Sequence, residues 1–285
     1  MMMCLYETFQ EIILRALEPF GEGTCLAFSG GVDSSLLASI FEEKFGKTTL
    51  LSVYFSGQDE LDFTRRAAEF LNSPLILEKI NLNELEQGVK DTLNIINYDR
   101  VALLENCIGF FFIFKYASEY GFKNVLSANG VDELFCGYDV FRRKYHEVNT
   151  MDLVEEITRT AIQDKVEIDK LASHFNLKYM SPLLEEDVVE FSKVVPISLK
   201  IRNEKDELRK HFIRIVARKK GLPAKVVYRK KRSLQYSSGL HQSLRRLARK
   251  KGFTNQKGNA MGYESGVKAY IKTLEKQTIK NPSTS

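Results

Sequence analysis

The sequence predicts an α/β fold, in which an open parallel sheet carries helices on both faces and is followed by a mostly helical, basic C-terminal part. Two patterns lead to this prediction. Up to about residue 150, short apolar or β-branched runs alternate with longer segments of helical periodicity, which is typical of βαβ units around a parallel sheet. Beyond it the periodicity is helical, apart from a short strand expected at residues 177–180, before Pro182.

The expected elements follow one another along the chain. Residues 1–20 carry charged positions between apolar ones, which predicts an amphipathic helix rather than a signal peptide. Strands are expected where apolar and β-branched residues run on, at residues 24–28, 48–55, 74–80 and 124–128. Helices are expected between them, from the turn after the first strand to Gly46, at residues 59–71, over residues 82–120 as one or two helices, and from Asp132 onward.

These elements divide the chain into three parts. An N-terminal helix (residues 1–20) precedes a single domain (residues 21–276), whose sheet core reaches about residue 150 and whose remainder is helical. The polar residues 277–285 are expected to form a flexible tail.

Composition excludes several classes of protein. With 44% apolar and 28% charged residues, a chain of 285 residues can form a globular core. The most apolar run, residues 108–114, stops at Lys115, short of the roughly 20 residues that span a bilayer, so no membrane association is expected. Four scattered cysteines lack the spacing of a disulfide framework or a zinc site and indicate a reducing cytoplasm: Cys4, Cys25, Cys107 and Cys136.

The positive charge is concentrated in one block. Residues 200–251 contain nineteen Lys and Arg against Glu204, Asp206 and Glu207, although the whole chain has a net charge of only +5. The rest of the chain is therefore net acidic. A basic block of this size indicates an anionic partner, either polyphosphate or nucleic acid.

The most specific motif follows the first expected strand. Residues 29–35 read Ser-Gly-Gly-Val-Asp-Ser-Ser and lead into a helix. The glycines let the backbone approach phosphate, while loop and helix N–H groups and serine hydroxyls can donate to it. The carboxylate of Asp33 would repel phosphate unless Mg²⁺ bridges them. The spacing is not that of a Walker A loop, and a tight turn with a helix cap is the simpler alternative.

A second motif follows the fourth expected strand. Residues 127–138 read Ser-Ala-Asn-Gly-Val-Asp-Glu-Leu-Phe-Cys-Gly-Tyr and place two carboxylates, Asp132 and Glu133, at a strand-to-helix turn. Taken alone, these carboxylates are equally well explained by the dipole at a helix N-terminus.

Together, these motifs resemble those of a known family. Residues 29–35 resemble the PP-loop of the N-type ATP pyrophosphatases, and with residues 127–138 they resemble the synthetase domain of asparagine synthetase and its relative β-lactam synthetase. Residues 181–185 and 228–239 are similar to that family's Pro-Phe-Leu-Asp and Arg-x-Lys segments. The resemblance spans about residues 22 to 240 and implies an adenine-nucleotide alpha-hydrolase-like fold.

The resemblance also implies roles for individual residues. Mg²⁺ would be bound by Asp33 and Asp132. The catalytic set would be Lys231, which would contact the α-phosphate in the transition state, together with Asp132 and Asn129. ATP would be bound through its pyrophosphate by Ser29, Gly30, Gly31, Asp33 and Ser34, and through adenosine by Phe28, Val53, Ser127 and Ala128.

Two departures from the family pattern bear on the substrate. Only about twenty residues precede the first strand, so the family's glutaminase domain is expected to be missing, and ammonia would arrive free or from a separate glutaminase subunit. Asn129 stands where the family has the Glu of Gly-Glu-Gly, and an amide cannot take up a proton as a carboxylate can. The acceptor is therefore left open, with asparagine as the default product.

The resemblance implies an ATP-dependent ligase that forms an acyl-adenylate from a small carboxylate, releases pyrophosphate, and then forms an amide with ammonia. One alternative is an RNA-modifying enzyme of the same superfamily that adenylates a tRNA base. In it the block at residues 200–251, with Phe212 and Tyr228 interleaved, would bind RNA. Another alternative is a non-catalytic ATP-binding subunit or sensor.

Overall fold

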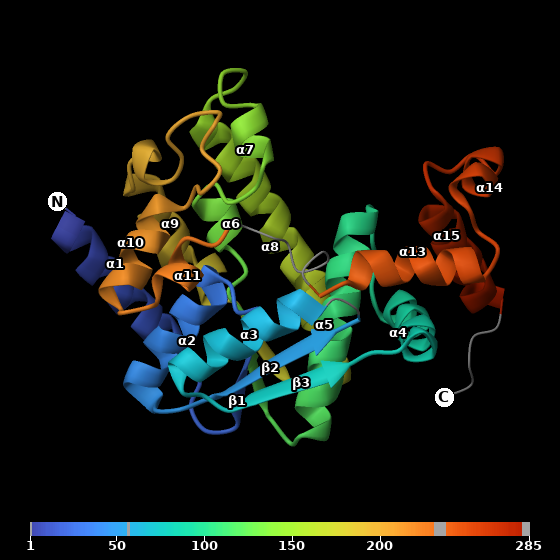
Figure 1. Cartoon of the computed structure of the whole chain (residues 1–285), viewed down its shortest axis with the longest axis horizontal. Helices are drawn as coiled ribbons and strands as arrows, with labels where there is room; N and C mark the ends of the chain where they lie inside the picture. Colours follow the sequence, from blue (N-terminus) through green and yellow to red (C-terminus); the bar gives the residue numbers. More distant parts are fainter. Residues whose placement is uncertain (1, 56–57, 231–237, 281–285) are drawn as a thin grey trace.

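The computed structural model describes residues 2–55, 58–230 and 238–280, and its centre is a five-stranded sheet (Figure 1). All neighbouring strands are parallel, and their order is β3-β2-β1-β4-β5. Each strand lies within a segment that the sequence predicts: β1 (Thr24–Ala27), β2 (Thr49–Tyr54), β3 (Leu75–Lys79), β4 (Asn124–Leu126) and β5 (Lys178–Met180). The predicted parallel α/β fold is therefore confirmed.

One face of the sheet is covered by the helices of the first apolar cluster. Leu26, Leu50 and Leu126 occupy equivalent positions on three neighbouring strands and turn their side chains into it. Besides two short elements described below, the helices that contribute to this cluster are α1 (Met2–Ala16), α2 (Val32–Phe45), α3 (Gln58–Leu71), α9 (Glu186–Val194), α10 (His211–Lys219) and α11 (Ala224–Val227).

The opposite face carries a second apolar cluster. The strand residues that point into it, Cys25, Leu51 and Val125, alternate with those of the first cluster, as the period of a strand requires. The helices that contribute to this cluster are α4 (Leu82–Ile95), α5 (Val101–Glu119), α8 (Thr150–His174), α13 (Leu240–Lys250) and α15 (Gly266–Lys280).

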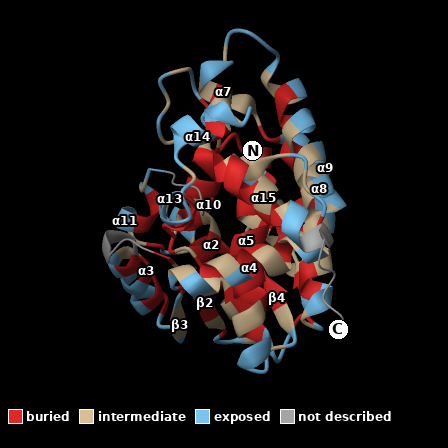
Figure 2. Cartoon of the chain, turned by 90° about the vertical axis from the view of Figure 1, so that its right-hand side faces the viewer, coloured by how far each residue is buried: buried red, intermediate tan, exposed pale blue. Residues whose placement is uncertain are grey.

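The apolar part of helix α5 extends beyond the run at residues 108–114 that stands out in the sequence. Among the described residues it is the one helix long and apolar enough to cross a membrane by length and composition. Two thirds of its apolar window is buried inside the protein, where Cys107, Phe111 and Phe112 pack in the second cluster (Figure 2). Its hydrophobicity is accounted for by this core position.

The remaining elements are short. The helix expected from Asp132 is interrupted, because Cys136 adopts a positive φ of 57°. At the other end of the chain, α15 continues to Lys280, four residues into the segment expected to be a flexible tail. The short helical elements are α6 (Val131–Leu134), α7 (Val140–Arg143), η1 (Pro182–Leu184), η2 (Ile197–Leu199) and α14 (Asn255–Ala260).

The basic C-terminal part is divided between the two sides of the molecule. Helices α10 and α11 lie beside α1 and α2, whereas α13, α14 and α15 lie at the opposite end with α4 (Figure 1).

The strand order reverses between β1 and β4, and ligands of open parallel sheets bind at such a switch point, outside the carboxyl ends of the strands.

Candidate functional site

The loop after β1 is fitted closely against α3. Gly30 has φ +71°, and a Cβ added to it would lie 2.9 Å from Thr64 Cα, so both its conformation and its contact require glycine. The hydroxyl of Thr64 donates to the carbonyl oxygen of Ser29 over 3.2 Å. The loop is thereby positioned at the start of α2, where unpaired backbone N–H groups attract anions.

The predicted phosphate-binding residues are brought together in this loop. Ser29 Oγ lies 3.1 Å from Ser34 Oγ, and it accepts a 3.3 Å hydrogen bond from the backbone N–H of Gly31. Ser34 Oγ in turn accepts from the backbone N–H of Ser29 over 3.3 Å. Hydroxyl and backbone donors therefore converge on one turn at the switch point of the sheet.

The loop after β4 separates the roles of the two adjacent carboxylates. Glu133 accepts hydrogen bonds from the backbone N–H of Gly130 (3.0 Å) and the hydroxyl of Tyr138 (2.5 Å), so it stabilises the start of α6. Burial, reinforced by Glu133, raises the pKa of Tyr138 well above its ordinary value and keeps the phenol protonated. The helix-terminus explanation thus applies to Glu133, while Asp132 is turned toward the loop after β1.

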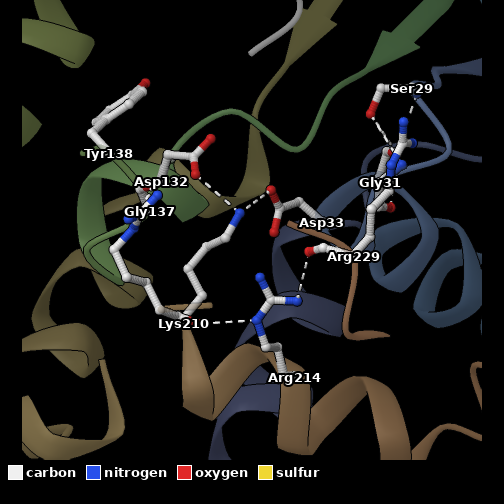
Figure 3. A network of polar contacts seen from close by, with 12 residues as sticks. Ser29, Gly31, Asp33, Asp132, Gly137, Tyr138, Lys210, Arg214 and Arg229 are labelled. Atoms are coloured by element: carbon white, nitrogen blue, oxygen red, sulfur yellow. Dashed lines mark hydrogen bonds and ion pairs between the residues drawn. The ribbon is translucent and has the colours of Figure 1, made fainter. Parts of the chain in front are cut away.

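Among the described residues, Asp33 and Asp132 share a cation that sequence analysis missed. Lys210 Nζ lies 2.7 Å from Asp33 Oδ2 and 3.0 Å from Asp132 Oδ1, and its side chain reaches between the two carboxylates (Figure 3). The lysine side chain is only 2% exposed. Burial alone would lower the pKa of Lys210, but Asp132 and Asp33 outweigh burial and raise it, so the ammonium is charged.

An uncommon backbone conformation holds Lys210 at this position. Arg209 and Lys210 have positive φ angles of 46° and 52° just before α10 begins. Arg209 Nε donates to the carbonyl oxygen of Gly137 over 3.1 Å, and the carbonyl of Arg209 accepts from Arg214 Nε over 2.8 Å. Nothing in the sequence distinguishes Lys210 from the other cations of residues 200–251, because its role depends on contacts with Asp33 and Asp132.

The two carboxylates suit a hard cation. Asp33 Oδ1 is buried and has no hydrogen-bond partner, so one oxygen of the pair is available as a ligand. Among the described residues no group of three or more His, Cys, Asp or Glu could hold a metal ion. Mg²⁺ commonly binds one or two carboxylates and completes its shell with phosphate oxygens and water. Asp33 and Asp132 therefore fit a magnesium ion that is bound together with a polyphosphate.

The residues predicted to line an adenosine pocket lie at the carboxyl ends of β1, β2 and β4, but on both sides of the sheet. Phe28 and Ala128 pack in or against the first apolar cluster, whereas Val53 packs in the second. Ser127 is buried, and its Oγ lies 2.7 Å from the hydroxyl oxygen of Tyr179. The structure brings these side chains to one edge of the sheet rather than into a single cluster.

Asn129 belongs to a neutral hydrogen-bonded group. Its side-chain amide donates to the hydroxyl of Tyr179 over 3.2 Å, and its backbone carbonyl oxygen accepts from Ser181 Oγ over 2.7 Å. Burial raises the pKa of Tyr179 far above its ordinary value. The position where the resembling family has a carboxylate is thus occupied by an amide with uncharged neighbours.

Lys231 lies outside the described residues, but the residues on either side of it are placed. Arg229 stacks its guanidinium 3.5 Å from the ring centre of Phe63, and that ring borders Gly30 of the phosphate loop. On the other side, the carbonyl oxygen of Ser238 accepts from the backbone N–H of Phe55, directly after β2, over 2.8 Å. Both neighbouring segments therefore lie at the carboxyl edge of the sheet.

Most of the chain matches the sequence model of a recognised family. The sequence model of the asparagine synthase family matches residues 21–166 and 151–263, which together cover most of the chain. The chain belongs to this family.

Curated relatives carry the name of one enzyme. A Methanocaldococcus jannaschii protein provisionally named asparagine synthetase [glutamine-hydrolyzing] 1 is 29% identical over 283 residues, covering 86% of this chain and 50% of that protein. Asparagine synthetase [glutamine-hydrolyzing] 1 of Arabidopsis thaliana is 24% identical and covers 85% of this chain and 43% of its own length. The chain thus spans about half the length of the curated relatives it matches.

One solved structure is similar over a shorter part. The NH3-dependent NAD synthetase of Campylobacter jejuni covers 69% of this chain and 97% of its own length, at 13% identity and a TM-score of 0.36. A likeness of this size supports no conclusion about function.

Proposed function

We propose that this chain is an ATP-dependent ligase that adenylates a small carboxylate, releases pyrophosphate, and forms an amide from the acyl-adenylate and ammonia. One observation carries the proposal. Asp33 and Asp132, from two loops that flank the switch point of the sheet, converge on one cation beside a turn rich in phosphate donors. The chain's membership of the asparagine synthase family supports the same class of reaction.

In the proposed complex, the turn at residues 29–31 binds the two outer phosphates of ATP. The hydroxyls of Ser29 and Ser34 and the backbone N–H of Gly31 exchange their internal hydrogen bonds for phosphate oxygens, and the backbone N–H of Gly30 adds a further donor. Magnesium, bound by Asp33 and Asp132, would neutralise phosphate charge and favour pyrophosphate as the leaving group. Bond breaking then falls between the α and β phosphates.

Adenosine is proposed to bind along the carboxyl ends of β1, β2 and β4, beside Phe28, Val53, Ser127 and Ala128. Lys231 is proposed to stabilise the negative charge that develops on the α-phosphate, since fixed charges at such positions are usually a large catalytic effect. This role is supported by the described residues on either side of the segment: Arg229 stacks on Phe63, and Ser238 accepts from the backbone N–H of Phe55. Holding the carboxylate beside the α-phosphate contributes through proximity.

The second half-reaction is proposed to use Asn129 to orient the nitrogen nucleophile rather than to deprotonate it. The amide side chain is fixed by Tyr179 and cannot act as a general base. When ammonia attacks the acyl-adenylate, AMP leaves and the nitrogen must lose one proton. Another group or water must take up that proton. Aspartate is the default acceptor. Ammonia is proposed to arrive free or from a separate glutaminase subunit. The proposed location is the cytoplasm.

The test is a pyrophosphate-release assay with ATP, ammonium chloride and a panel of carboxylic acids that includes aspartate. Lys231→Ala is expected to lower turnover by about 10²-fold or more, because it removes the cation at the α-phosphate. Lys230→Ala is the matched control and should stay near wild type, because Lys230 is 73% exposed and pairs with Glu207. Formation of ADP and orthophosphate in place of AMP and pyrophosphate contradicts the proposal.

A specific observation favours a second candidate function, modification of RNA. The exposed side of α13 presents three arginines that form no ion pair with any residue in the described part of the chain. Together with Gln242 they line a hollow of about 290 Å³: Arg245, Arg246 and Arg249. Pyrophosphate release that needs bulk tRNA would support this candidate, whereas ATP binding without pyrophosphate release under any condition would indicate a non-catalytic subunit or sensor.

A further inference from the structure

The ammonium of Lys210 lies where the proposed function places a metal ion. Its Nζ contacts Asp33 Oδ2 at 2.7 Å and Asp132 Oδ1 at 3.0 Å in a buried site (Figure 3). A metal ion bound to the remaining oxygens of this pair, such as Asp33 Oδ1, would lie within a few ångströms of the ammonium, and like charges at that distance repel each other. The carboxylates therefore bind either the lysine or the metal.

The fold keeps Lys210 there despite an unfavourable backbone. Non-glycine residues rarely adopt positive φ angles, yet Arg209 and Lys210 do so in succession, at 46° and 52°. Hydrogen bonds from Arg209 Nε to Gly137 and from Arg214 Nε to Arg209 hold this conformation. The backbone is thus arranged to deliver one ammonium to the two carboxylates before any ligand binds.

We propose that Lys210 is a built-in counter-ion of the metal carboxylates, which it neutralises in the nucleotide-free protein and yields to magnesium only when polyphosphate is bound. This inference rests on the proposed function, which assigns polyphosphate to the turn at residues 29–31. An ammonium that leaves Asp33 and Asp132 needs another anion, because an unpaired buried charge is strongly unfavourable. The phosphates provide it. Metal and polyphosphate therefore bind as a coupled pair, and metal alone binds weakly.

Manganese binding to the nucleotide-free protein, followed by the EPR signal of the free ion, tests this proposal. Lys210→Met is expected to bind Mn²⁺ at least about tenfold more tightly than wild type, because both carboxylates lose their counter-ion. Lys200→Met is the matched control. It removes another buried ammonium, one that contacts Met151 and the ring of Phe135 instead of a carboxylate, and it should leave Mn²⁺ affinity unchanged. Adding Asp33→Asn to Lys210→Met should abolish the gain.

Loss of Lys210 leaves two carboxylates facing each other and can destabilise the metal-free protein. Lys210→Gln, which keeps two N–H donors for the pair, is therefore measured in parallel, and thermal unfolding is recorded with and without Mn²⁺. An unfolding temperature that rises with Mn²⁺ in these variants and not in wild type supports the proposal. Equal Mn²⁺ affinity in wild type and both variants overturns it. No substrate is present, so this result is separate from pyrophosphate release, where a failure of the proposed function itself would appear.

Discussion

Residues 200–214 and helix α13 are both rich in Lys and Arg, but only the first region buries several of these side chains. In the first region Lys200, Lys210 and Arg214 are almost completely buried, at 0%, 2% and 3% exposure. On α13, Arg245, Arg246 and Arg249 face solvent. A buried cation must find compensating partners within the protein, whereas an exposed one is solvated by water. Charge counted along the sequence therefore gives no information about which cations are available to a partner.

The three buried cations are compensated in three ways. Lys210 has two carboxylates, and the pKa of its ammonium is raised in spite of burial. Arg214 donates to backbone carbonyls at both sides of α10, and burial lowers its pKa. Lys200 has a thioether and an aromatic ring, and burial lowers the pKa of Lys200 to about 8. These environments indicate different roles. Lys210 belongs to the candidate site and Arg214 holds the backbone around α10, whereas the burial of Lys200 lowers stability without a compensating carboxylate among the described residues.

The largest effect on stability is expected from Arg214. Replacing it with Met leaves the carbonyls of Leu208, Arg209 and Arg229 without their donor in a buried region, which should lower the free energy of unfolding by about 3–5 kcal/mol. Chemical unfolding measures the change. Arg218→Met, on the exposed side of the same helix, is the control and should change stability by less than about 0.5 kcal/mol. If both variants lowered the free energy of unfolding equally, the burial of Arg214 and its hydrogen bonds to backbone carbonyls would not be what makes it important for stability.

Lys200→Met is expected to stabilise the protein. The pKa of Lys200 falls from its ordinary value of 10.5 to about 8 in the folded state, so at pH 7 both states are protonated and the folded state bears the full cost of a buried charge. Removing it should raise the free energy of unfolding by about 2–3 kcal/mol. Between pH 8 and 10.5 the unfolded state binds more protons than the folded one, so wild-type stability rises with pH and the advantage of the variant shrinks.

Urea unfolding of both proteins at pH 7 and at pH 10 tests this prediction. Common effects of alkaline pH cancel in the difference between the two proteins. A gain that is absent at pH 7, or that grows toward pH 10, would mean that Lys200 is compensated by something other than Met151 and Phe135.

The smallest effect on stability is expected on α13. The triple variant Arg245→Ala, Arg246→Ala, Arg249→Ala should change the free energy of unfolding by less than about 0.5 kcal/mol per site. Any effect should appear in polyanion binding: the slope of log affinity for tRNA against log salt should become shallower by about 0.7–0.9 for each phosphate that an arginine no longer neutralises. A triple variant of ion-paired cations elsewhere (Arg65, Arg143 and Lys193) is the control. Unchanged tRNA binding removes the basis of the second candidate function.

The sheet and the turn after β1 were predictable because their main signals are local. Apolar and β-branched runs marked all five strands, and the paired glycines within residues 29–35 marked the turn, whereas the close contact of Gly30 with Thr64 depends on the packing of α3. Other features were not predictable. Asp132 and Glu133 are adjacent in sequence, and only the hydrogen bonds of Glu133 to Gly130 and Tyr138 assign it to the framework. The role predicted for Lys231 stays a prediction.

The contact between Asp33 and Lys210 joins residues 177 positions apart. Its closure requires the sheet, both loops and α10 to be in place, so it is among the most entropically demanding contacts of the chain to form. The contact of Lys210 with the two carboxylates therefore forms only after most of the polypeptide has been made and has folded, which ties the completion of the candidate site to that of the tertiary structure.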